Sequence, residues 1–243
     1  MRTMIILVFG LVAVVMGAEP TLEFQVGQAV NRIRLENQVQ PLVMDEVLSH
    51  VAQLHAQEML REGYFGHVSP NDMCKTTRDR LRQCHRYCLS SAENLHRTVG
   101  YSRQSAGEDA VKGWMESSGH RKNLLNSRYN RMGTGISSDG HQILFVQVLS
   151  YEPVVVQKLD CVPQGGGYRL RLEAQVAEGT RKGAIFFDGK RQKDWEASED
   201  GRFSVELSVP RQGLLQIGQS IGLREWSVET EIPIPVGRED HNH

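Results

Sequence analysis

The chain has 243 residues, of which 40% are hydrophobic and 23% are charged, and its formal net charge is −1. This length suits one large domain or two modest ones, and the composition excludes a disordered or fibrous chain. Because the charges nearly balance, no global field attracts the chain to nucleic acid, and we expect no nucleic-acid partner.

The first residues are typical of a secretory signal. Arg2 precedes an apolar, uncharged run from Met4 to Met16, and Gly17 and Ala18 are small enough for cleavage after either. The run is too short to cross a bilayer comfortably. We predict a signal peptide at residues 1–18, a secreted protein (periplasmic or extracellular) and no stable membrane span. An uncleaved anchor is the alternative.

Helical spacing of apolar residues and capping signals predict the helices of the first half: residues 20–37, 45–60, 76–83, 105–116 and 120–126. Asp45 is the expected N-cap of the second helix, and Ser105 with Glu108 fits a capping box for the fourth. The stretch from Ser90 to Thr98 is expected to be irregular. Strands at residues 132–137 and 142–149 should then form a hairpin through a type I′ turn at Asp139-Gly140.

The four cysteines agree with export to an oxidising compartment. Cys74, Cys84 and Cys88 are clustered and Cys161 is distant. Their spacing lacks the Cys-x2-Cys unit of structural zinc sites. We predict at least one disulfide within residues 74–88, and Cys161 either pairs with the remaining cysteine of that loop or stays free.

The pattern changes to period two after Tyr151. Strict alternation at residues 168–174, 202–209 and 227–232 predicts half-buried antiparallel strands, about six in all, in a small Ig-like β-sandwich. Pro233 marks an edge strand. Trp195 and Trp226 are expected to pack in the core or in an interface, with surface stacking on sugars as the alternative. The predicted domains are a signal peptide (1–18), an α+β domain (19–152), a linker (153–163), a β-sandwich (164–237) and a polar tail (238–243).

The first half resembles the bacterial branch of the CAP superfamily, also called the SCP or PR-1-like family, over roughly residues 25–150. The matching motifs are Asn31-x-x-Arg34, Gly63-Tyr64-Phe65-x-His67-x-Ser69-Pro70, Ala92-Glu93-Asn94, Trp114, Gly119-His120-Arg121-x-Asn123-Leu124-Leu125 and Gly133-x-Gly135. The resemblance implies an α-β-α sandwich with a cleft lined by two histidines and two acidic residues.

By position, the resemblance assigns His67, Glu93 and His120 to this cleft. The second family glutamate falls at Ser117. Glu116 is the candidate for this fourth cleft residue, although it stands one residue early, which on a helix is a rotation of about 100°. We expect Ser69, Asn94 and Arg121 to support the cleft residues or cap the backbone around them. His55 lies on the buried face of its helix and is expected to be a packed core residue.

Two neutral imidazoles beside a carboxylate are suited to a divalent cation such as Zn²⁺, with His67 and His120 as ligands. No serine lies in a Gly-x-Ser-x-Gly elbow. We therefore expect a secreted binding protein whose extracellular ligand is a metal, lipid, glycan or protein. The alternative is an extracellular metal-dependent hydrolase or peptidase with Glu93 as general base. A purely structural or adhesive module is a third reading.

Overall fold

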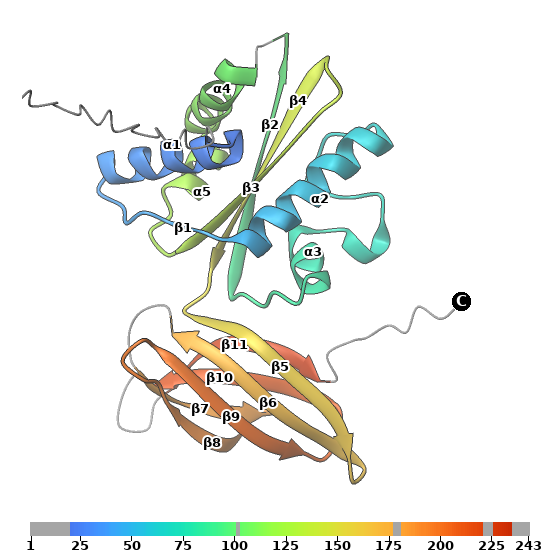
Figure 1. Ribbon diagram of the computed structural model, residues 1–243, viewed down its shortest axis with the longest axis vertical. Coiled ribbons are helices and arrows are strands. Elements are labelled where there is room, and N and C mark those ends of the chain that lie inside the picture. The colour runs from blue at the N-terminus through green and yellow to red at the C-terminus, as the bar shows by residue number, and fades with distance from the viewer. Residues whose placement is uncertain (1–19, 101–102, 177–180, 221–225, 235–243) are drawn as a thin grey trace, which may run out of the picture.

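The computed structural model describes residues 20–100, 103–176, 181–220 and 226–234, so the predicted signal peptide and polar tail lie outside the described residues. The first half is mixed α and β, and the second half is all β (Figure 1). None of the helices in the described part of the chain is both long and apolar enough to cross a membrane.

The helices of the first half are α1 (Leu22–Glu36), α2 (Glu46–Glu62), a 3-10 turn η1 (Asp72–Cys74), α3 (Thr77–Gln83), α4 (Arg103–Glu116) and α5 (Ser118–Leu124). Asp45 accepts hydrogen bonds from the first amides of α2, as predicted, and Gly63 ends that helix with φ of 69°. Thr76 begins α3 through a capping box with Asp79. Each of these signals was legible in the sequence because capping depends on adjacent residues alone.

A four-stranded sheet separates the helices into two layers. Its strands are β1 (Val43–Met44), β2 (Ser90–Val99), β3 (Arg131–Ser138) and β4 (Gln142–Tyr151), in the order β1-β3-β4-β2. Helices α1, α4 and α5 share a core with one face, and α2 and α3 share a core with the other (Figure 1). This is the expected α-β-α sandwich.

Two glycines of β3 allow α2 to lie directly on the sheet. A Cβ at Gly133 would collide with the backbone of Leu48 and Ser49, and one at Gly135 with the backbone of Ala52 and Gln53. Gln53 also exchanges two hydrogen bonds with the backbone of Ile136, of 3.0 and 2.9 Å. The close approach therefore fixes both the distance and the register of α2 along β3.

The second half is a β-sandwich, as predicted. One sheet has the order β5-β6-β9 and the other β11-β10-β7-β8. The strands are β5 (Val154–Gln164), β6 (Gly167–Val176), β7 (Lys182–Phe187), β8 (Lys190–Glu196), β9 (Arg202–Val209), β10 (Gly213–Ser220) and β11 (Trp226–Ile234). Apolar residues from both sheets form one shared core. Strand β11, which carries Pro233, is at the edge of its sheet.

Several expectations are corrected. Residues 90–98 form strand β2, paired with β4 along its whole length. Helix α4 begins at Arg103, so Ser105 lies inside it and is not its cap. Most of the expected linker is strand β5, so the all-β half starts at Val154. Positive φ occurs at Gly140 and not at Asp139, which excludes a type I′ turn there.

The state of the cysteines differs from the prediction, and the position of Trp195 decides between the two alternatives given for it. All four cysteines are free thiols in this structure, so the predicted disulfide within residues 74–88 is not formed in it. Trp195 is 4% exposed and stacks on Phe203 with ring centroids 4.2 Å apart. Stacking on sugars is therefore wrong for Trp195. The side chain of Trp226 lies outside the described residues.

Candidate functional site

The candidate site is built around Glu93, in the middle of strand β2. Its backbone pairs with Val148 of β4, and its side chain is 2% exposed. Burying a charged carboxylate is costly unless it is paired and hydrogen-bonded. Three side chains from three other segments meet this requirement.

Both oxygens of Glu93 have close partners. The Nδ1 atom of His67, in the loop after α2, lies 2.9 Å from Oε1. The Nδ1 atom of His55, on α2, lies 3.0 Å from Oε2. Arg80 of α3 donates from Nη2 to Oε2 over 2.8 Å. We call these four residues the Glu93 cluster.

The cluster keeps Glu93 ionised. Burial by itself raises the pKa of Glu93, but the hydrogen bonds from His55 and His67 and the charge of Arg80 together outweigh it and lower the pKa to about 2. An ionised carboxylate only accepts hydrogen bonds, so both imidazoles carry their proton at Nδ1. In the neutral state His67 therefore has its lone pair at Nε2, and its side chain is 54% exposed.

His55 was expected to be a packed core residue. The structure confirms that it is buried but shows that it also contacts Glu93. Its side chain has no exposed surface, but it bonds to Glu93 and is part of the site. The signal was present in the sequence, because a histidine inside an apolar helix stripe needs a hydrogen-bond partner. Its Nε2 is buried without a partner among the described residues.

Arg80 lies on a short helix with several basic residues, yet its side chain is only 5% exposed. Besides Glu93, Arg80 donates to the carbonyl oxygens of Cys74 (3.1 Å) and His67 (3.3 Å). It therefore positions both the carboxylate and the loop that carries His67. Sequence spacing gave no sign of this, because the partners come from distant segments.

A second buried carboxylate shapes the same loop. Ser69 donates to Oε1 of Glu58 and Tyr64 donates to Oε2, each over 2.8 Å. Burial, and then the bond to Glu58, raise the pKa of Tyr64 to about 12. Ser69 also accepts from the backbone amide of Asn71. Its hydroxyl is thus engaged in holding the loop, which leaves it unsuited to act as a nucleophile.

His120 lies on α5, within electrostatic reach of His67. The pKa of His120 is lowered, first by burial and then by the charges of His67 and His96. Its backbone carbonyl accepts a 3.3 Å hydrogen bond from Asn94. Asn94 in turn accepts from Asn123 of α5 over 2.9 Å. This connection joins the helix that carries His120 to the strand that carries Glu93.

The remaining two predicted residues are engaged elsewhere. The side chain of Glu116 is 68% exposed, and its carboxylate faces Lys112 one turn earlier on α4. Arg121 donates to the carbonyl of Met115 over 3.2 Å at the surface, and so supports the junction of α4 and α5. Neither side chain is directed to the Glu93 cluster by these contacts.

The donor set limits what metal chemistry the site can perform. Among the described residues, no group of three or more His, Cys, Asp or Glu side chains is placed to hold a metal ion. Both oxygens of Glu93 are already used by His55, His67 and Arg80, so its role toward a metal is to orient His67 from behind. The contacts of Glu93 therefore leave the exposed imidazole of His67 as the part of the cluster that faces solvent.

Comparison with known proteins places the first half in context. Residues 28–151 match the family profile described as CAP, the cysteine-rich secretory protein family. The uncharacterized membrane protein YlbC of Bacillus subtilis (strain 168) is 35% identical over 118 residues, covering 49% of this chain and 32% of that protein. The uncharacterized protein YkwD of the same organism is 32% identical over 128 residues, covering 49% and 43%. The chain thus spans less than half the length of either relative.

Among solved structures, an extracellular protein containing a SCP domain from Bacillus anthracis str. Ames is 30% identical. The match has a TM-score of 0.48 and covers 54% of this chain and 40% of that one.

Proposed function

The chain belongs to the cysteine-rich secretory protein (CAP) family, and from this premise we propose that it is a secreted binding protein whose ligand site is the exposed edge of His67. The observation that carries the proposal is the 2.9 Å bond between Glu93 and His67 Nδ1, which holds a half-exposed imidazole in one orientation. A fixed side chain binds a ligand without losing rotamer freedom. Arg2 and the apolar run after it support secretion.

We propose a divalent cation such as Zn²⁺ as the first ligand. Nε2 of His67 has a free lone pair when the ring is neutral, and the lowered pKa of His120 favours the neutral, metal-binding form of that ring. Two imidazoles leave open positions on a tetrahedral ion. A bound ion would supply a Lewis acid to which an anionic group of a lipid, glycan or protein ligand can attach.

The test is zinc titration by calorimetry in a chain whose tail histidines, His241 and His243, are replaced by alanine. We expect micromolar binding, weakened at least tenfold by His67→Ala and by His120→Ala. His141, an exposed residue of the β3–β4 turn, provides the matched control, and His141→Ala should bind as the parent does. Undiminished binding by His67→Ala would remove this histidine from the site and end the proposal.

A hydrolase is the second candidate, favoured by the same carboxylate–imidazole bond. Glu93 is a poor general base because its pKa is about 2 and its oxygens are occupied. We propose Nε2 of His67 as the base instead, oriented by Glu93, with water as the attacking group. In a screen of peptide and ester substrates, turnover that His67→Ala abolishes would establish this candidate. If zinc binds but no substrate is turned over, the hydrolase candidate fails and only the binding proposal remains.

A further inference from the structure

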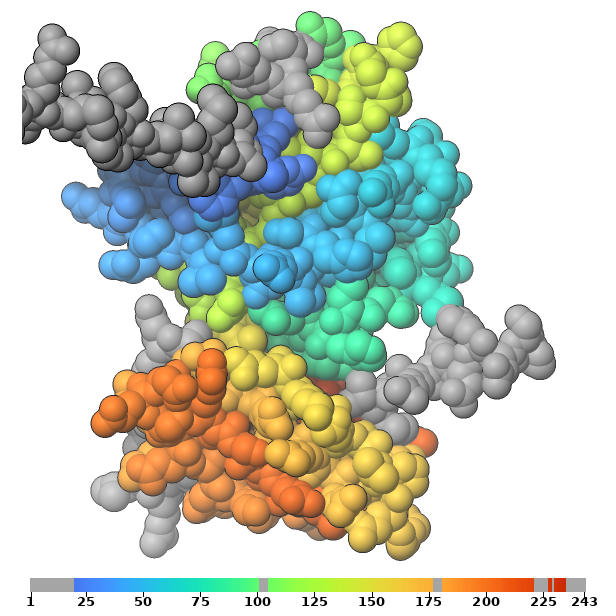
Figure 2. Space-filling view, in the orientation of Figure 1, coloured from blue at the N-terminus to red at the C-terminus, as the bar shows by residue number. Residues whose placement is uncertain are grey.

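A cavity lies at the opposite edge of the sheet from the Glu93 cluster. Its walls are α1 and α2 and its floor is β3, and its volume is about 580 Å³. In Figure 2, yellow-green atoms of the sheet are visible between the dark blue helix α1 and the light blue helix α2. Pockets of this size accommodate small organic ligands. Since β2 is at one edge of the sheet and β1 at the other, this cavity is separate from the proposed His67 site.

The charges that line the cavity have one sign. Glu23, in the first turn of α1, and Glu46, in the first turn of α2, both face it, and no lysine or arginine lines it. Neither carboxylate has an ion-pair partner among the described residues. Such positions complement the helix dipoles, but they also create a negative entrance that favours a cationic ligand.

A hydroxyl without a protein partner, on a largely buried residue, is the second sign of a ligand. Thr134 on β3 lines the cavity and is 5% exposed, and within the described chain its hydroxyl has no hydrogen-bond partner. Its neighbours Met132 and Ile136 belong to the core on the α1 face, and side chains two residues apart share a face of the sheet. Thr134 therefore points toward the α1 side of the cavity floor. The hydroxyl keeps some accessible surface, so water or a ligand in the cavity can supply the missing partner.

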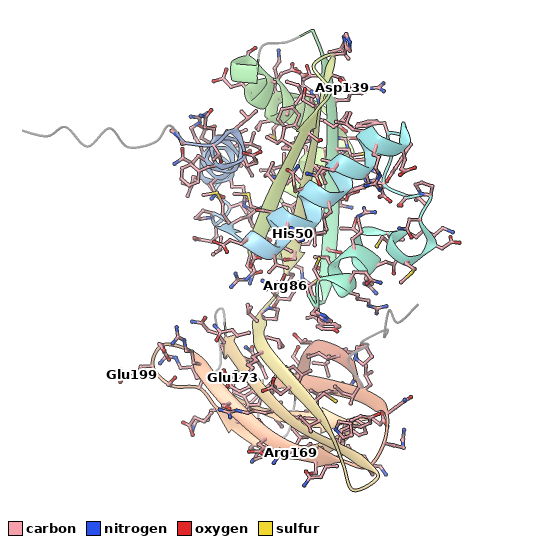
Figure 3. The ribbon with its side chains drawn as sticks, turned by 45° about the vertical axis from the view of Figure 1, so that its right-hand side comes forward. His50, Arg86, Asp139, Arg169, Glu173 and Glu199 are labelled. Atoms are coloured by element: carbon pink, nitrogen blue, oxygen red, sulfur yellow. The ribbon has the colours of Figure 1, made fainter. Side chains whose placement is uncertain are left out.

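The rest of the lining suits an apolar chain. Phe24 and Met44 are 42% and 40% exposed at the rim, and Met132 is buried below them. Methionine adapts its shape to irregular ligands. His50 also faces the cavity from the exposed side of α2, where it is labelled in Figure 3. A long apolar ligand with one polar end would match this distribution.

We propose that the cavity binds a primary ammonium group carried on an apolar chain. The ammonium lies between Glu23 and Glu46, and the chain packs against Phe24 and Met44. The Thr134 hydroxyl accepts a hydrogen bond from the ligand. This chemistry is available from a free alkylamine or from a lysine side chain of a partner protein.

The test is calorimetric titration of the full chain with n-octylammonium, n-octanol and an acetylated lysine methylamide at constant ionic strength. We expect n-octylammonium to bind at least tenfold more tightly than n-octanol. Glu23→Gln with Glu46→Gln should weaken ammonium binding at least tenfold, and Thr134→Val about threefold. The control Glu36→Gln with Glu199→Gln removes the same number of charges from exposed positions elsewhere and should change nothing.

The outcomes separate the alternatives. Preference for n-octylammonium over the lysine analogue identifies a free amine as the source, and the reverse identifies a partner's lysine. Equal binding of n-octanol and n-octylammonium in every variant would overturn the proposal, as would no binding at millimolar ligand. His67→Ala should leave this binding unchanged, so failure here does not bear on the His67 site.

Discussion

Replacing Glu93 by glutamine is expected to destabilise the α-β-α half strongly at neutral pH and weakly in acid. Glutamine preserves the shape of the side chain but removes its charge. Arg80, whose side chain is 5% exposed, then loses its counter-charge inside the protein. One amide also cannot accept at both ends from His55, His67 and Arg80, because its NH₂ end is a donor.

The magnitude follows from the pKa of Glu93. The Glu93 cluster lowers this pKa from its ordinary value of 4.5 to about 2. A shift of about 2.5 units corresponds to about 3 kcal/mol, since one unit is worth about 1.4 kcal/mol. Breaking a buried ion pair by removing one partner typically costs about 3–5 kcal/mol, so the two arguments agree in size.

The pH dependence of the free energy of unfolding follows from the lowered pKa of Glu93. The stabilisation from Glu93 is fully present above the unfolded-state pKa near 4.5 and is lost as the pH falls toward the folded-state pKa of about 2. The wild-type free energy of unfolding should therefore fall by about 3 kcal/mol through this window because of Glu93. The difference between wild type and Glu93→Gln should shrink over the same window.

Urea unfolding followed by circular dichroism from pH 7 to pH 2 measures this difference, with Glu36→Gln as an exposed control. Hydrogen exchange at pH 7 shows which part of the protein loses stability in the variant. Amides of β2 and α3 should lose about a hundredfold of protection, the equivalent of about 3 kcal/mol, while β6 in the β-sandwich is unchanged. A wild-type minus variant difference that stays constant from pH 7 to pH 2 would refute the reasoning.

Three further changes test other parts of the structure. Gly135→Ala should cost more than about 3 kcal/mol or prevent folding, because its Cβ meets the backbone of Gln53; thermal unfolding measures it. Ser69→Ala removes the 2.8 Å bond to Glu58 and should lower the free energy of unfolding by about 1–3 kcal/mol, read from urea curves. Tyr87→Ala, which removes a contact with the β-sandwich core, should make the junction between the halves more sensitive to limited proteolysis.

Local signals predicted much of the fold. The cap at Asp45 depends on adjacent residues and the strands after Tyr151 on a period of two, so both are legible in one sequence. Strand β2 was missed because it lies between two helical layers and β4, and Glu93 and Asn94 interrupt its apolar pattern with buried polar side chains. Because both faces of β2 are covered by helices, its residues do not alternate between apolar and polar, and the usual sequence pattern of a strand is absent.

The site was predictable only in part, for a similar reason. The order of the family motifs along the chain identified Glu93 and His67, and in the structure these two side chains are in contact. This order did not identify Arg80, because a basic residue on a helix looks the same in sequence whether it faces solvent or a buried carboxylate. His55 was placed in the core, although its position in an apolar stripe implied a buried hydrogen-bond partner. Glu116 was a candidate as the acidic residue one position before the family position at Ser117, and its side chain is exposed to solvent and faces Lys112.

Helix α3 and the loop after it connect the Glu93 cluster to the second half of the protein. Arg80 in α3 holds Glu93, and Arg86, three residues after the helix, contacts Asp45 and Glu152, as its place near the junction in Figure 3 allows. The Nε atom of Arg86 lies 2.6 Å from Oε2 of Glu152 without an aligned hydrogen bond, so the contact is one of charge. Tyr87 then packs against the β-sandwich core.

Glu152 is a buried carboxylate that depends on Arg86 for charge compensation. Burial raises the pKa of Glu152, and Arg86 and a hydrogen bond from Ser150 only partly offset it. Its side chain is 1% exposed and stands two residues before β5. Removing the charge of Arg86 would leave Glu152 buried with less compensation at the point where the halves join. The segment from Arg80 to Tyr87 therefore contacts two buried carboxylates, Glu93 in the Glu93 cluster and Glu152 at the junction of the two halves.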